Sequence, residues 1–121
     1  MKNKVIADIF EANPHRTYKT LERRTLKLSE EVGEASQAIL SITSPANLKK
    51  LTKEDYLEEV TDVIIVAMDI MLTNFEGEEL TPEELEQRFE QILDKKLTKW
   101  REKIEQLGEM GEAALAQGTT C

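Results

Sequence analysis

The sequence is poor in the residues that form disulfides and tight turns. Its 121 residues include one cysteine, three prolines and five glycines. The single Cys121 excludes an intramolecular disulfide and a multi-cysteine metal site. So few glycines and prolines argue against a turn-rich β-sandwich or barrel. With only three Phe, two Tyr and one Trp, most of the core must come from aliphatic side chains.

Positive charge and long apolar runs are also scarce. Lys and Arg total 16 against 24 Asp and Glu, a net charge of −8. Such a surface repels a phosphate backbone, so we expect no nucleic acid polymer as a partner. The most apolar run, residues 63–72, is interrupted by Asp69 and has about half the length of a membrane span. No apolar signal core follows the first residues, so we expect a cytoplasmic protein without membrane contact.

Apolar residues at helical spacing fill most of the chain and predict an all-α fold. A short helix is expected over residues 5–10. A second starts between Pro14 and Thr20 and ends near Pro45, and a third runs from Thr52 to about residue 74. The fourth starts at Thr81-Pro82 and ends at Gly108. We therefore predict a helical bundle of three long helices and one short one, forming a single domain over 1–108, with a flexible tail over 109–121.

The third predicted helix is apolar around nearly its whole circumference. A helix of this kind is surrounded by protein on all sides. In so short a chain a second copy is the economical source of that protein, so we predict an oligomer. The pattern leaves open whether it is a homodimer or a homotetramer.

Two pairs of acids spaced three residues apart lie on consecutive helices: Glu31 with Glu34, and Glu59 with Asp62. Spacing alone is weak evidence, since roughly five such pairs are expected by chance at this acidic content. Helical projection adds that Glu31 borders the buried stripe, and that Glu59 and Asp62 lie about 60° apart among apolar residues. Carboxylates there need a cation, a proton or a hydrogen-bond partner. Oxygen ligands favour Mg²⁺ or Mn²⁺, while the alternative is pairing with Lys or Arg across the bundle surface.

Other charged residues carry weaker signals. His15 has no acid three residues before it, which excludes a ferritin-type di-iron site. Lys96 projects within the apolar face of the fourth helix, with Lys99 on its flank. Either the aliphatic parts of these two lysine side chains cover the apolar core, or their ammonium groups contact phosphate oxygens beside the acids. Asp69 has three possible roles: an additional metal ligand, a hydrogen-bond acceptor behind the ligands, or a contact between helices. The last two together are favoured over the first.

Residues 28–34 (LSEEVGE) and 57–63 (LEEVTDV) resemble the E-E-x-x-E and E-x-x-D motifs of MazG-like nucleoside triphosphate pyrophosphohydrolases. That group belongs to an all-α superfamily with dimeric dUTPases and phosphoribosyl-ATP pyrophosphohydrolases. The resemblance spans about residues 21–100 and includes the basic stretch 96–99. It implies Mg²⁺-dependent cleavage of a nucleoside triphosphate between the α and β phosphates, giving a monophosphate and pyrophosphate, with Mn²⁺ as a substitute ion.

The resemblance also implies roles for individual residues. The metal ligands would be Glu31, Glu34, Glu59 and Asp62. Glu34 or Glu30 would take the proton of the attacking water, and Lys96 and Lys99 would neutralise the leaving pyrophosphate. Two alternatives stay open: the same fold acting on dUTP or phosphoribosyl-ATP, and a non-catalytic acidic scaffold or binding module.

Overall fold

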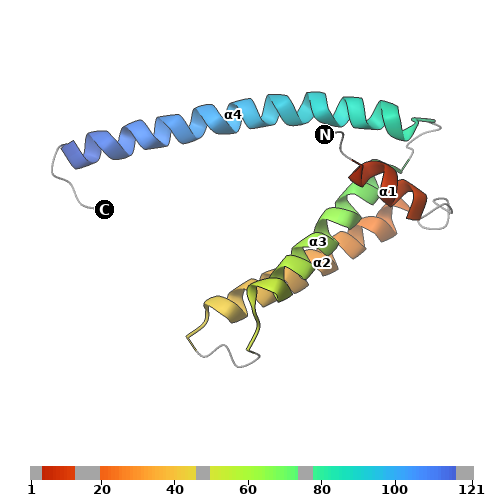
Figure 1. The fold of residues 1–121 in the computed structure, drawn as a ribbon, viewed down its shortest axis with the longest axis horizontal. Helices are drawn as coiled ribbons and strands as arrows, with labels where there is room; N and C mark the ends of the chain where they lie inside the picture. Colours follow the sequence, from red (N-terminus) through yellow and green to blue (C-terminus); the bar gives the residue numbers. More distant parts are fainter. Residues whose placement is uncertain (1–3, 13–19, 46–49, 74–77, 117–121) are drawn as a thin grey trace. The chain divides into compact units, whose positions relative to one another are not determined.

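The computed structural model describes residues 4–12, 20–45, 50–73 and 78–116 of the chain, with side chains described as far as residue 111. Within these ranges the chain forms four α-helices and no strand (Figure 1). The helices are α1 (Val5–Ala12), α2 (Leu21–Thr43), α3 (Lys53–Met71) and α4 (Pro82–Ala116). The predicted all-α fold, with one short and three long helices, is confirmed. His15 lies outside the described residues.

A threonine stands at the start of each of the three long helices, and two of these, Thr52 and Thr81, are the starts that the sequence predicts. Thr20 and Thr81 each accept a hydrogen bond at 3.2 Å from the backbone N–H three residues later. At the start of α3, the backbone N–H of Thr52 donates to the Asp55 carboxylate at 2.6 Å. Each cap satisfies an N–H that has no partner inside the helix, so these starts are set by local chemistry.

The end of α4 differs from the prediction. The helix continues through Gly108 and Gly111 to Ala116, so the expected end at Gly108 is wrong. A glycine costs a helix about 1 kcal/mol relative to alanine, and the good helix formers around Gly108 tolerate that cost when no proline follows. Residues 117–121 of the predicted tail lie outside the described part.

The chain divides into two compact units, residues 1–85 and 86–121. In the first unit, α2 and α3 lie side by side as an antiparallel hairpin, and α1 packs against α3 (Figure 1). The second unit consists of the greater part of α4. The predicted single domain over 1–108 stays a prediction. No helix in the described ranges has the length and apolarity of a bilayer span.

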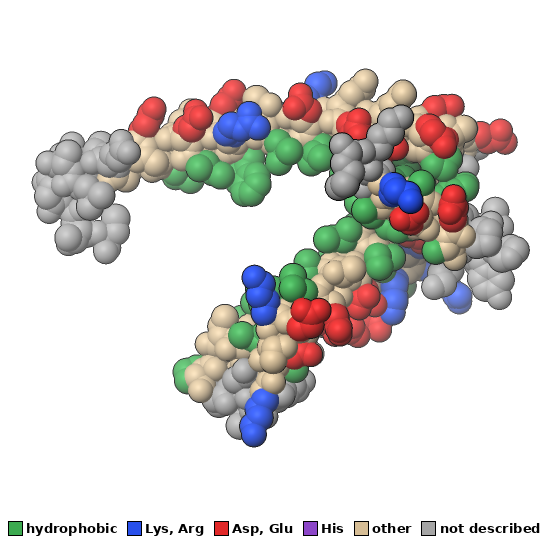
Figure 2. Space-filling view, viewed as in Figure 1, with side chains coloured by type: hydrophobic (Ala, Val, Ile, Leu, Met, Phe, Trp, Pro, Cys, Tyr) green, Lys and Arg blue, Asp and Glu red, His purple; other side chains and the backbone are tan. Residues whose placement is uncertain are grey.

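Few apolar side chains are buried in these units. Among the described residues, the buried apolar ones are Ile6, Ala35, Ala38 and Leu72. No residue of α3 is fully buried, although its sequence is apolar on nearly every side. Along α4, apolar side chains form a stripe with charged residues on the other side (Figure 2). The two units, each taken alone, therefore leave apolar helix faces exposed.

Candidate metal centre and adjoining pocket

The α2–α3 hairpin brings together carboxylates from both helices. Glu31, Glu34 and Glu59 each offer an oxygen, and these oxygens lie within 4.8 Å of one another. Glu31 and Glu34 share a face of α2 because residues three apart lie on the same side of a helix. Oxygen ligands lie about 2.0–2.6 Å from Mg²⁺ or Ca²⁺, so small side-chain rotations would let one ion reach all three. We call these three residues the acidic group.

Two oxygens of the acidic group lack hydrogen-bond partners. Oε2 of Glu31 and Oε2 of Glu59 are buried and have no partner among the described residues. Glu31 as a whole is only 7% exposed. A buried carboxylate oxygen without a partner is costly, about 1–3 kcal/mol or more for a charged group. The group therefore fits a cation on chemical grounds independent of its spacing.

One cation of the protein already touches the acidic group. The Lys27 ammonium lies 3.0 Å from Oε1 of Glu31 and 3.5 Å from Oε2 of Glu30. The hydrogen bond to Glu31 is the main cause that raises the pKa of Lys27, followed by the charge of Glu30. The sequence raised pairing with Lys or Arg across the bundle surface as the alternative to a cation. The pairing observed for Glu30 and for one oxygen of Glu31 is instead with a lysine of the same helix. The spacing of three and four residues along α2 could have predicted it.

Several negative charges act on the Glu34 carboxylate. The negative charge of Glu31 is the main cause that raises the pKa of Glu34 above its ordinary value. Desolvation and the charges of Glu59 and Glu30 act in the same direction, and Lys27 opposes them. Because Glu34 is exposed, water reaches its carboxylate directly. A divalent ion in the acidic group would reverse this repulsion.

The remaining predicted site residues lie outside the acidic group. Asp62 follows Glu59 by three residues, is exposed, and does not join the group. Glu30 is exposed and pairs with Lys27. Lys96 and Lys99 are exposed on α4 in a surface depression beside Asp94 and Glu102. The structure thus brings together three of the four acids predicted as ligands.

Asp69 makes a contact between helices. Its Oδ2 accepts a hydrogen bond from Nε of Arg24 at 2.8 Å, and Arg24 is 2% exposed. Of the roles that the sequence leaves open for Asp69, the helix–helix contact is the one observed. Sequence reasoning missed Arg24, although a signal existed: Arg24 precedes Glu34 by ten residues, and Asp69 follows Glu59 by ten. An antiparallel hairpin that places Glu34 near Glu59 therefore also places Arg24 near Asp69.

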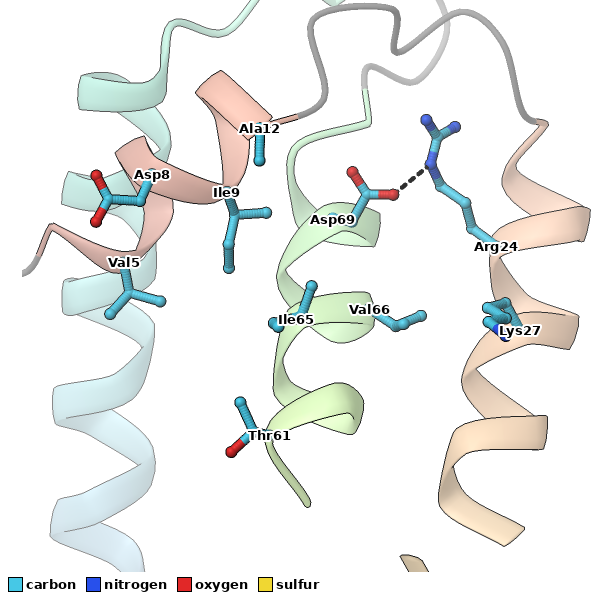
Figure 3. Close-up of a pocket in the computed structure, with 10 residues that line it drawn as sticks. All are labelled: Val5, Asp8, Ile9, Ala12, Arg24, Lys27, Thr61, Ile65, Val66 and Asp69. Atoms are coloured by element: carbon cyan, nitrogen blue, oxygen red, sulfur yellow. Dashed lines mark hydrogen bonds and ion pairs between the residues drawn. The ribbon is translucent and has the colours of Figure 1, made fainter. Parts of the chain in front are cut away.

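A pocket of about 520 Å³ lies between α1, α2 and α3 (Figure 3). Ile9 and Ala12 of α1, and Ile65 and Val66 of α3, supply apolar walls. Lys27 also lines the pocket, so the residue that touches Glu31 belongs to the pocket as well. The remaining lining residues include Thr61 and the Arg24–Asp69 pair. Sequence reasoning missed this pocket because it depends on where α1 packs.

Neither a protein-family model, nor a curated protein, nor a solved structure matches the chain. What the described residues offer is a group of three carboxylates, two buried oxygens without partners, an ammonium group and an adjoining pocket with apolar walls. Oxygen-rich sites of this kind suit hard divalent cations.

Proposed function

We propose that the chain is a Mg²⁺-dependent nucleoside triphosphate pyrophosphohydrolase, which cleaves between the α and β phosphates to give a nucleoside monophosphate and pyrophosphate. The proposal is carried by the acidic group, in which Glu31 and Glu59 each keep a buried oxygen without a partner. The resemblance of residues 28–34 and 57–63 to the MazG-like acidic motifs supports a nucleotide as the substrate.

Glu31, Glu34 and Glu59 would hold the ion, and Asp62 would join as a fourth ligand from its exposed position one turn along α3. An all-oxygen donor set favours Mg²⁺, with Mn²⁺ as a substitute, over zinc. When bound, the ion supplies charge neutralisation and polarisation of the phosphoryl group. It fits here because the acidic group carries more negative charge than Lys27 offsets.

Residues of the chain would move the proton and balance the charge. A water oxygen attacks phosphorus, the bond to the leaving pyrophosphate breaks, and a carboxylate takes the water's proton. Glu34 is the first choice for this base, because its carboxylate is exposed to water. Glu30 is the second choice, because the Lys27 ammonium already occupies one oxygen of its carboxylate. Lys96 and Lys99 are assigned to neutralising the pyrophosphate.

The functional form would be a homodimer or homotetramer in the cytoplasm. Exposed apolar side chains occur on α2, α3 and α4, including Leu40, Ile64, Trp100 and Leu107. Monomeric soluble proteins rarely leave such large apolar faces open to water. A second copy of the chain would bury apolar faces of both copies at once.

The decisive experiment measures pyrophosphate release from a panel of ribo- and deoxyribonucleoside triphosphates, dUTP and phosphoribosyl-ATP, with and without Mg²⁺. Mg²⁺-dependent release from one or more of them is expected. The substrate used best separates a general pyrophosphohydrolase from a dUTPase-like or phosphoribosyl-ATP enzyme. No turnover of any nucleotide by a chain with intact helical circular dichroism would favour the acidic scaffold instead.

A further inference from the structure

Lys27 connects the acidic group with the pocket. Its ammonium lies 3.0 Å from Oε1 of Glu31, and its side chain forms part of the pocket wall. The side chain is 45% exposed, so it can change rotamer without disturbing buried packing. A rotation about the side-chain bonds alone would carry the ammonium from Glu31 toward the pocket.

A divalent ion bound to Glu31 would compete with Lys27. Both need the same carboxylate, and the added positive charges repel the ammonium at close range. Only Oε1 of Glu31 is engaged by Lys27, while the buried Oε2 has no partner among the described residues. The two cations would therefore bind Glu31 less strongly together than either does alone.

The pocket suits a ligand with an apolar ring and an anionic group. In Figure 3, Ile9 of α1 points toward the space beside Ile65 of α3, which gives an apolar surface to a flat ring. Lys27 of α2 and Thr61 of α3 also line the pocket and supply an ammonium and a hydroxyl group. Binding sites for small molecules commonly combine apolar walls with a few polar groups in this way.

We propose that this pocket binds the nucleoside half of the nucleotide, and that Lys27 transfers its ammonium from Glu31 to a phosphate of that nucleotide when a divalent cation occupies the acidic group. In this proposal the divalent cation displaces the Lys27 ammonium from Glu31, and the ammonium then pairs with a phosphate of the substrate. This inference rests on the proposed function and extends it to the residue that couples cation and substrate.

Calorimetric titration of Mg²⁺ into the metal-free protein tests whether Lys27 and the divalent cation compete for Glu31. Lys27→Met removes the competing charge, so Mg²⁺ should bind about threefold to tenfold more tightly than to the wild type, the range expected for losing one nearby charge. Arg23→Met is the matched control, because it removes the same charge one helical turn beyond Lys27, about 12 Å along α2 from Glu31. It should shift Mg²⁺ affinity less than twofold.

A second titration tests whether Lys27 contacts a phosphate and whether the pocket binds the nucleoside. At saturating Mg²⁺, inorganic triphosphate and the α,β-methylene analogues of dATP, dCTP, dGTP and dTTP are each titrated separately. Lys27→Met should weaken both kinds of ligand about threefold to tenfold, the opposite sign to its effect on Mg²⁺. Ala12→Phe fills the pocket from the exposed end of α1. It should weaken the nucleotide analogue that binds best and leave inorganic triphosphate unchanged.

A purely structural role for Lys27, holding Glu31 in place, predicts weaker Mg²⁺ binding in Lys27→Met, and that result would overturn the inference. Unchanged affinities in Lys27→Met, or equal effects of Ala12→Phe on both ligands, would overturn it too. In each of these cases a wild type that binds Mg²⁺ and releases pyrophosphate leaves the proposed function standing. A folded wild type that binds no Mg²⁺ removes both proposals.

Discussion

Arg24 of α2 and Asp69 of α3 join the two helices through an ion pair of 2.8 Å between residues 45 positions apart in the sequence. Arg24 is 2% exposed and the Asp69 side chain 18%, so the pair is largely shielded from water. A shielded charge pair contributes modest net stability but strong specificity for its partner, because each charge is costly alone. The pair therefore favours one register of α2 against α3, the register that also brings Glu34 near Glu59.

Replacing one member of this pair should destabilise the fold. Asp69→Asn removes the carboxylate charge that faces the buried Arg24 guanidinium, and we expect a loss of about 2–3 kcal/mol in the free energy of unfolding, below the full cost of a completely buried pair. Urea denaturation at one fixed protein concentration measures it. The double variant Arg24→Met/Asp69→Leu should recover part of the loss, and a double variant no more stable than Asp69→Asn would contradict the shielded-pair argument.

Glu59→Gln should abolish turnover while keeping or raising stability. The change removes a ligand and also removes negative charge beside Glu31 and Glu34. Residues that merely support metal ligands already cost about 10–100-fold when mutated, so a loss of at least a hundredfold is expected for a ligand. Pyrophosphate release at limiting Mg²⁺ gives the activity and thermal unfolding gives the stability. Glu83→Gln, an exposed acid in the first turn of α4, is the control and should change neither.

Asp62→Asn should reduce activity less than Glu59→Gln at saturating Mg²⁺. Asp62 is exposed and outside the acidic group, so it would have to turn inward to meet the ion. Its loss should show mainly as a higher Mg²⁺ concentration for half-maximal activity. Wild-type activity of Asp62→Asn at every Mg²⁺ concentration would remove this residue from the ligand set.

The raised pKa of Glu34 predicts a pH dependence of stability in metal-free buffer. A carboxyl group whose pKa is higher in the folded than in the unfolded protein binds more protons when folded, so stability falls as pH rises from the unfolded pKa to the folded one. Glu34→Gln has no such proton and should lose less stability than the wild type over the pH range above about 4.3, the ordinary pKa of glutamate. Urea midpoints of both proteins in EDTA check this. A difference between them that stays constant across that range would show that Glu34 is not under repulsion when folded.

The apolar stripe of α4 should support self-association. Trp100 is 62% exposed, and Leu107 is 61% exposed further along the stripe. Trp100→Glu places a charge in this stripe and should shift sedimentation toward the monomer at micromolar concentration. Thr98→Glu adds the same charge about 160° around the helix and should leave the assembly unchanged. A monomeric wild type, or equal dissociation by both variants, would count against assembly through this stripe.

The sequence alone determined those features that depend on neighbouring residues. The helix starts at Thr20, Thr52 and Thr81 follow from side chains that bond backbone groups within one turn. The shared face of Glu31 and Glu34 follows from helical geometry in the same way. The end of α4 escaped prediction because one glycine is a weak stop signal, and its small cost is offset by the helix formers on either side.

Only the tertiary structure decided which residues from different helices meet. That Glu59 joins the acidic group while Asp62 stays outside depends on how α3 is rotated about its axis against α2. The partnership of Arg24 with Asp69 depends on the register of the hairpin, and the pocket depends on the place where α1 packs. Rotation, register and docking result from packing over many side chains at once, so no local pattern in the sequence specifies them.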